Sequence, residues 1–283
     1  MSLWKEGFIM KTKNKKYIFW HIPFIFLMVI SLYPIVFGIS NSFKTLQDAY
    51  HTILQLIPRN PTLENFKYLS ESLPIVKITM NTFFIASVTT LVRLTISFLA
   101  AYALTFFKFT GKRLLYFALI STIFIPFTVI MIPNYLMMSE YKLLNNNWGV
   151  ILPQLADATG IFLLVQTMRQ IPKPIIEAAK IDNISDLQII KGIVLPITRH
   201  ALFSTGIWYF ITTWNEYVWP RLILNKVENY TLPIAIQNFI SAEGGTNFTV
   251  AMAVTVITII FPLGLYLIFQ KYIIGSFSSS GIK

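Results

Sequence analysis

Long apolar runs separated by shorter polar segments make up most of the chain. Several runs reach roughly 20 residues, the length that an α-helix needs to cross a bilayer. They lie at about 17–39, 78–107, 114–138, 148–168, 201–224 and 248–269. The pattern therefore predicts an all-α integral membrane protein with six transmembrane helices.

Features within three of these runs qualify the prediction. The first run follows a basic start, as in a signal peptide, but it lacks a small-residue cleavage site, so we expect an uncleaved first span. Pro126 and Pro133 are expected to kink the third span. The fourth run is less uniform because it includes Pro153, Gln154 and Asp157.

The polar segments between the runs give the expected domain organisation. It comprises a basic N-terminal tail (1–16), the first transmembrane helix (17–39), an extracytoplasmic loop (40–77), a five-helix core (78–270) that includes a polar loop (172–199), and a C-terminal tail (271–283).

Composition supports the membrane assignment. Of the 283 residues, 55% are hydrophobic and 12% charged, and a soluble domain of this size could not bury so much apolar surface in one core. Cysteine is absent, which excludes disulfides, iron–sulfur clusters and cysteine nucleophiles. His21, His51 and His200 are scattered, so no metal site is expected.

The net charge of +11 could suggest a nucleic-acid partner, but its distribution indicates membrane topology instead. Six spans place both termini on one side of the membrane. Fifteen basic residues lie in the segments on that side, and seven lie in the opposite loops. The positive-inside rule therefore predicts that both termini and the 172–199 loop are cytoplasmic.

The polar stretch 177–196 is the most distinctive part of that loop. Pro172 and Pro174 suit the first turn of a helix. Ala178 and Ala179 would give this helix a small-residue surface that another protein could approach closely. We therefore expect a short helix outside the membrane with one face free to dock.

A second helix is expected to follow within the same stretch. Leu187, Ile190 and Val194 recur at helical spacing, and Leu195-Pro196 is expected to end the helix. Two interpretations remain open for the whole stretch. It is either a docking surface for a partner or an amphipathic loop that lies on the lipid surface.

This chain carries no motif that would bind ATP and so supply energy for transport. The one Gly-Lys pair, Gly111-Lys112, precedes Arg113 and lacks the earlier glycine of a phosphate-binding loop. Any ATP would therefore be used by another subunit. A secondary transporter, which would predict inverted repeats, and a membrane-embedded enzyme, which would need clustered catalytic residues, are the alternatives.

The motifs in this chain resemble one transporter family. The run Glu177-Ala178-Ala179, with Asp182 and Ile193–Pro196, resembles the EAA loop of permease subunits of binding-protein-dependent ABC importers. Further stretches resemble the carbohydrate-type permeases, which include the smaller maltose-transporter membrane subunit: 100–104 (AAYAL), 214–220 (WNEYVWP), 231–233 (TLP) and 270–281.

The resemblance implies a non-catalytic subunit of a bacterial or archaeal cytoplasmic-membrane importer for a sugar or related polyol compound. It implies a second, different permease, two ATPase subunits that bind the ATP and magnesium, and an extracytoplasmic binding protein. This chain itself would hold no cofactor. The residues implied to contact the ATPase are Glu177, Ala178, Ala179, Asp182, Asn183 and Leu195.

Two departures from the family pattern bear on the geometry of this loop. Asn183 stands where the loop usually has glycine, and asparagine tolerates the left-handed backbone that a turn there needs. His200 stands where a proline is usual. Exchanging Ala179 for arginine is expected to abolish transport while the protein remains inserted.

Ionisable residues within the spans are candidates for a translocation path. Arg93, Asp157 and Glu216 could form a polar path for a hydroxyl-rich substrate, or they could pair for structural reasons. Trp214 with Asn215 could bind a sugar, since aromatic faces stack on sugar rings and amides bond hydroxyls.

The tryptophans also admit another interpretation. Trp214 and Trp219 fall near the predicted outer end of the fifth span, where tryptophan commonly serves as an interfacial anchor.

Overall fold

A computed structural model describes residues 3–52, 54–240 and 247–278, and this part of the chain contains helices but no strand. It divides into two compact units. Unit 1 comprises Met1–Ser72 and Phe239–Ile257, and unit 2 comprises Leu73–Asn238 and Thr258–Lys283. The first boundary, after Ser72, lies near the expected start of the five-helix core at residue 78, and the other two, after Asn238 and Ile257, fall within the last two helices.

Unit 1 contains α1 (Leu3–Ser42), α2 (Leu46–His51), α3 (Glu64–Ser72) and the first part of α14 (Phe248–Ser278). Its polar centre is Lys44, whose side chain is fully buried. The Lys44 Nζ donates to the carbonyl oxygens of Thr52 at 2.9 Å and Gln55 at 2.6 Å. Burial lowers the pKa of Lys44, and the nearby Asp48 carboxylate acts in the opposite direction.

Unit 2 contains the remaining elements, except that the last two residues of α13 belong to unit 1. They are α4 (Ile75–Phe106), α5 (Lys112–Ser121), η1 (Thr122–Phe124), α6 (Phe127–Glu140), α7 (Asn147–Ile151), η2 (Leu152–Gln154), α8 (Ala158–Met168), α9 (Lys173–Ile181), α10 (Asp186–Ile189), the π-helical turn η3 (Ile190–Val194), α11 (Leu195–Trp214), α12 (Val218–Ile223), η4 (Val227–Asn229), α13 (Leu232–Ile240) and the rest of α14.

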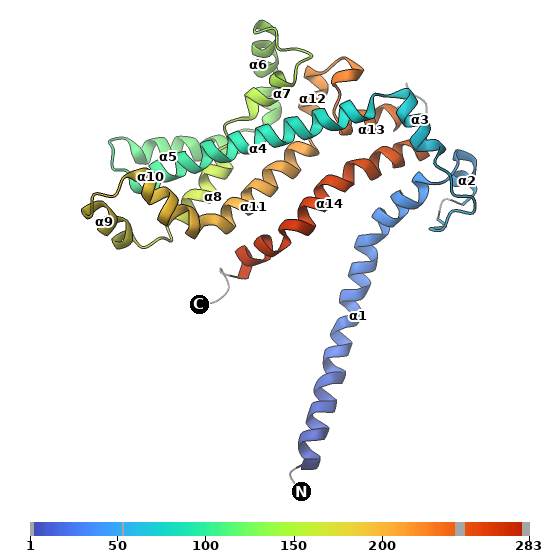
Figure 1. The fold of residues 1–283 in the computed structure, drawn as a ribbon, viewed down its shortest axis with the longest axis horizontal. Coiled ribbons are helices and arrows are strands. Elements are labelled where there is room, and N and C mark those ends of the chain that lie inside the picture. The colour runs from blue at the N-terminus through green and yellow to red at the C-terminus, as the bar shows by residue number, and fades with distance from the viewer. Residues whose placement is uncertain (1–2, 53, 241–246, 279–283) are drawn as a thin grey trace. The chain divides into compact units, whose positions relative to one another are not determined.

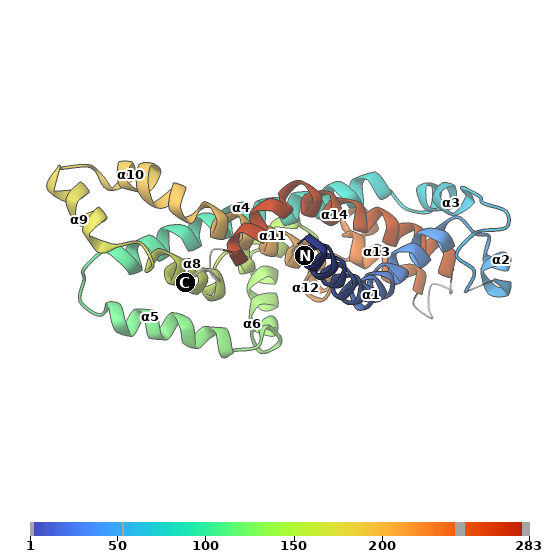
Figure 2. The ribbon, with the colours of Figure 1, turned by 90° about the horizontal axis from the view of Figure 1, so that it is seen from below.

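The centre of unit 2 is a layer in which α4 packs along both α11 and α8 (Figure 1). At one end of this layer, α9 and α10 lie together (Figure 2). A hydrophobic core joins that end to the layer. Its members include Ala101 and Tyr102 of α4, Met168 of α8, Ile176 of α9 and Ile189 of α10.

Three helical segments of the described chain are long and apolar enough to cross a membrane: His21–Ser42, Ile75–Phe106 and Phe248–Gln270. Two bent pairs raise this number to five if each pair is one span. They are Lys112–Phe124 with Phe127–Glu140, bent by 98°, and Asn147–Gln154 with Ala158–Met168, bent by 45°. The helical membrane architecture is confirmed, and the count of six spans stays a prediction.

The 98° bend has a local cause at Pro126. A residue before proline is forced away from helical backbone, and Ile125 is extended with φ −85° and ψ 113°. Helix α6 then starts afresh after Pro126. Pro133, by contrast, lies inside α6 and does not divide it.

The predicted fifth span (201–224) is also interrupted. Helix α11 ends at Trp214, and α12 begins at Val218. Helix α11 is not among the segments counted as candidate spans.

The prediction that Leu195-Pro196 ends a helix is wrong. The helical backbone runs without a break from Asp186 through Trp214, and Pro196 lies in the first turn of α11. The preceding π-helical turn explains this outcome. The Leu195 N–H donates to the Ile190 carbonyl five residues back, so the wider turn makes room for the proline ring and its missing donor.

Candidate functional site

Helix α9 begins and ends as its sequence predicts. Pro172 is its N-cap and Pro174 lies in its first turn, where a missing N–H costs nothing. After the C-cap at Asp182, Asn183 takes the left-handed conformation with φ 53°. A capping box between Ser185 and Gln188 then starts α10. Asparagine therefore supports the turn where the family pattern has glycine.

The two faces of α9 differ in burial. Glu177 and Ala178 are exposed, as are Asp182 and Asn183 beyond the helix end. Ala179 is only 5% exposed, because it packs into the hydrophobic core of unit 2.

The prediction that Ala179 belongs to a free small-residue surface is therefore wrong. Ala179 lies three residues after Ile176, which is buried in the same core, and residues at this spacing share a helix face. Of the predicted ATPase contacts, Glu177, Ala178, Asp182, Asn183 and Leu195 remain at the surface. Their contact with an ATPase stays a prediction.

A polar contact that sequence reasoning missed ties this segment to α4. The Tyr102 hydroxyl donates to Asp186 Oδ1 at 2.7 Å, while the rest of Tyr102 is buried in the core. The Lys180 Nζ lies 5.7 Å from the centroid of the Phe107 ring, at the end of α4. Tyr102 belongs to the 100–104 stretch, which resembles the carbohydrate-type permeases. The sequence therefore marked this stretch as distinctive but did not show that Tyr102 contacts Asp186.

The structure brings together the ionisable residues of the spans, which are far apart in sequence. Arg93 of α4 donates from Nε to the Gln154 carbonyl at 2.7 Å and from a terminal guanidinium nitrogen to Gln154 Oε1 at 3.3 Å. Its guanidinium also lies 4.9 Å from the Tyr209 ring centroid. Asp157 and Glu216 both interact electrostatically with Arg93.

Both carboxylates also serve local structure. Asp157 is the N-cap of α8 and accepts a hydrogen bond from the Thr159 N–H at 3.1 Å. Glu216 accepts from the Trp219 N–H at 3.5 Å, just before α12. The cluster thus satisfies many of its own hydrogen-bonding groups, which favours the structural interpretation of these residues over a path.

Tyr209 of α11 completes this cluster and was not predicted. It is fully buried, and its hydroxyl lies 3.1 Å from Ser97 Oγ of α4. A Cβ added to Gly160 of α8 would overlap the same hydroxyl. Only glycine therefore fits where these three helices meet. A buried tyrosine has no distinctive pattern in a sequence that is 15% aromatic.

The structure contradicts the interfacial-anchor prediction for Trp214 and Trp219, because both side chains are fully buried. The Trp214 indole N–H donates to the Thr258 carbonyl at 3.0 Å, and that of Trp219 donates to the Val150 carbonyl at 3.1 Å. Buried indoles need such partners.

The same burial bears on the predicted sugar ligands. The Trp214 ring packs against Phe210 at 5.5 Å and Phe261 at 5.1 Å between centroids, so its faces are covered by protein. The prediction that a sugar stacks on Trp214 is therefore wrong for this structure. Asn215 is exposed, although its amide already donates to the Ile211 carbonyl at 2.9 Å.

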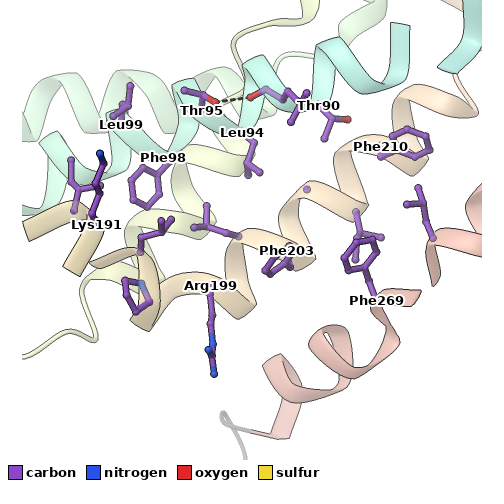
Figure 3. A pocket seen from close by; sticks show the side chains of 18 of the residues that line it. Thr90, Leu94, Thr95, Phe98, Leu99, Lys191, Arg199, Phe203, Phe210 and Phe269 are labelled. Carbon is purple, nitrogen blue, oxygen red and sulfur yellow. Dashed lines mark hydrogen bonds between the residues drawn. The ribbon is translucent and has the colours of Figure 1, made fainter. Parts of the chain in front are cut away.

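A groove of about 1000 Å³ lies between α4, the η3–α11 segment and α14 (Figure 3). Its walls are apolar and include Leu94, Phe98, Phe203 and Phe269, and its charged residues are Lys191 and Arg199. Thr95, at its edge, donates its hydroxyl to the Leu91 carbonyl. Walls of this kind offer few partners for the hydroxyl groups of a sugar.

Residues that could hold a metal ion are not grouped. Within the described residues, no three His, Cys, Asp or Glu side chains come together at one place.

Comparison with known proteins identifies the family. Residues 93–275 match the family described as binding-protein-dependent transport system inner membrane component. The chain belongs to this family. The matched region contains the polar cluster, the α9–α10 segment and all of the groove's lining residues except Thr90 and Leu91.

Two relatives extend the match over nearly the whole chain. The sn-glycerol-3-phosphate transport system permease protein UgpE of Escherichia coli is 30% identical over 261 residues, covering 90% of this chain and 93% of that protein. The arabinooligosaccharides transport system permease protein AraQ of Halalkalibacterium halodurans is 28% identical over 279 residues, covering 97% and 100%.

A solved structure supports the fold. The crystal structure of a bacterial ABC transporter involved in the import of the acidic polysaccharide alginate contains a chain that matches with a TM-score of 0.79 at 23% identity. The match covers 93% of this chain and 98% of that chain. The permease fold is therefore shared over almost the full length.

Proposed function

We propose that this chain is the membrane permease subunit of an ATP-driven importer for a sugar or a related polyol compound, such as an oligosaccharide or glycerol phosphate. The observation that carries the proposal is the family match over 93–275, with relatives named for glycerol phosphate and arabinooligosaccharides. The subunit itself carries out no chemistry. It moves substrate by alternating access.

The proposed topology has six spans, with both termini and the loop from α9 to α10 in the cytoplasm. The interrupted α11–α12 segment would then be the fifth span, and the two bent pairs would be the third and fourth. The excess of basic residues in the tails and in the α4–α5 and α8–α11 loops supports this orientation.

The proposed partners are a second, different permease, two ATPase subunits and an extracytoplasmic binding protein. Helix α9 would contact one ATPase subunit through the exposed residues Glu177, Ala178, Asp182 and Asn183. The partner ATPases would bind the ATP and magnesium. Closure of the ATPase pair would move α9, and the Tyr102–Asp186 hydrogen bond would carry that movement to α4.

Transport by the complete complex tests this function. The complex is reconstituted in vesicles with its binding protein, and uptake of labelled glycerol 3-phosphate, arabinooligosaccharides and an amino acid is measured. We expect uptake of a sugar or polyol that requires ATP and the binding protein. Uptake driven by an ion gradient after ATP depletion would instead indicate a secondary transporter, and uptake of the amino acid alone would refute the substrate class.

Single-cysteine variants test the docking face, because the chain contains no other cysteine that could react. In inside-out vesicles, Ala178→Cys should react with a membrane-impermeant maleimide, and the ATPase subunit should block the reaction. The matched Ala179→Cys should react slowly because Ala179 is buried. Labelling of Ala178→Cys only in right-side-out vesicles would refute the topology.

A further inference from the structure

The turn between α4 and α5 forms a second cavity, of about 910 Å³, in which positive charge collects. Lys112, Arg113 and Arg169 line it, the first two at the start of α5 and the third just after α8. Across the described chain, no acidic side chain forms an ion pair with any of the three. Cations in a cavity that have no acidic partner are suited to an anion supplied from elsewhere.

Local contacts hold two of these cations in place. The Lys112 Nζ donates to the carbonyl oxygens of Thr105 at 3.2 Å and Phe107 at 2.8 Å. The Arg169 guanidinium lies 4.8 Å from the Tyr116 ring centroid. The cations are therefore positioned despite their mutual repulsion, which Lys173 increases at Lys112.

The backbone adds to this positive site. Helix α5 begins at Lys112 after Gly111, whose φ is 80°, and no side chain within the described residues caps it. The first N–H groups of a helix lack partners within the helix and form the positive end of its dipole. The uncapped helix start and the three cations thus meet at one cavity.

The same cavity has apolar walls that reach the surface. Leu114 is 72% exposed and Phe117 is 68% exposed, and both line it. A small soluble anion would gain nothing from these side chains. An anionic phospholipid would contact them with its acyl chains while its phosphate met the cations.

We propose that the α4–α5 cavity binds the headgroup of an anionic phospholipid, with its acyl chains along Leu114 and Phe117. Basic pockets next to membrane helices on the cytoplasmic side are suited to such headgroups, and this turn lies on the predicted cytoplasmic side. The proposal depends on the membrane location of the chain and is independent of the transported substrate.

Lipid titration of the purified, delipidated complex tests the proposal by native mass spectrometry. The probes are phosphatidylglycerol, the zwitterionic phosphatidylcholine and inorganic phosphate as a competitor. We expect one tight phosphatidylglycerol site. Each cation near an anionic headgroup is worth about fivefold in affinity, so the variant Lys112→Gln/Arg113→Gln/Arg169→Gln should weaken that site on the order of 100-fold.

Two matched variants control for net charge and folding. Lys108→Gln/Lys191→Gln/Arg199→Gln removes three cations from the same predicted side but outside the cavity, and should keep the site. Lys112→Arg/Arg113→Lys/Arg169→Lys preserves charge and should also keep it. If the glutamine variant does not fold, the single Arg113→Gln, with an expected loss of about fivefold, takes its place.

Three results would overturn the proposal. Phosphatidylcholine could bind as tightly as phosphatidylglycerol, or the control and cavity variants could lose equal affinity. Inorganic phosphate could displace the lipid completely, which would make this a site for small anions. Each result is read from binding alone, so none depends on whether the complex transports a sugar.

Discussion

The clearest test of the α9 assignment compares arginine at two adjacent positions. Ala179→Arg places a guanidinium into the core beside Ile176, where the side chain it replaces is 5% exposed. An unpaired buried charge costs about 3–5 kcal/mol, and overpacking adds about 1–3 kcal/mol. The total is comparable with the whole stability of a typical domain, about 5–15 kcal/mol. Ala178→Arg on the exposed face should cost within about 0.5 kcal/mol.

Thermal unfolding in detergent, followed by tryptophan fluorescence, measures the difference. We expect Ala179→Arg to lower the midpoint by about 8 °C or more, at roughly 2–4 °C for each kcal/mol. Ala178→Arg should unfold like the parent but no longer co-purify with the ATPase subunit. The variant Ala178→Ser keeps a small side chain and should keep the partner.

Two outcomes would refute this reasoning. A normal unfolding midpoint for Ala179→Arg would contradict its burial against the core of unit 2. Normal transport by Ala178→Arg would contradict docking through the exposed face of α9. The sequence-based expectation was that Ala179→Arg abolishes transport while the protein remains inserted. Burial of Ala179 adds a loss of stability to that expectation.

Three further changes test other parts of the fold, each by thermal unfolding. Gly160→Ala should cost about 1–3 kcal/mol by overpacking against Tyr209, and an unchanged midpoint would contradict that contact. Trp219→Phe should cost about 0.5–1.5 kcal/mol because the Val150 carbonyl loses the indole donor while it keeps the Gln154 Nε2 donor, and equal stability would argue against this hydrogen bond. Lys44→Met should cost about 1–3 kcal/mol because the Thr52 and Gln55 carbonyls lose the ammonium donor, although the Thr52 carbonyl keeps the Gln55 N–H; Lys67→Met, at an exposed site, should cost less than about 0.5 kcal/mol.

The apolar runs predicted the helical membrane architecture because a bilayer demands long apolar helices. Local rules also located the start of α9 after Pro172 and the left-handed turn at Asn183. These features depend on residues that are adjacent in the chain. The 98° bend at Pro126 was expected only as a kink, because a proline shows where a helix is interrupted but not the angle at which it continues.

Burial was harder to predict, because it depends on packing between segments that are distant in sequence. Tryptophans near the end of a span are typical of an interfacial belt, yet Trp214 and Trp219 are covered by neighbouring helices. For α9, the spacing of Ile176 and Ala179 could have predicted the burial of Ala179, since residues three apart lie on one helix face. The small size of Ala179 suggested a contact with a partner, whereas it serves close packing within the chain.

Helix α4 links the two polar features of unit 2. Tyr102 bonds to Asp186 at the α9–α10 end, and Arg93, nine residues earlier and about 13 Å along the helix, bonds to Gln154. Helix α11 makes a second link, since it continues from α10 and carries Tyr209 into the Arg93 cluster.

The two links differ in stiffness. Helix α4 is a regular α-helix between Tyr102 and Arg93, whereas α11 is joined to α10 through the π-helical turn Ile190–Val194. A π turn interrupts the regular hydrogen-bond ladder and is a place where a helix can bend. If an ATPase moves α9 as proposed, α4 would carry that displacement to the cluster as a rigid rod, while the π turn would absorb part of it before α11. Loss of the Tyr102 hydroxyl would then weaken the stiffer of the two links.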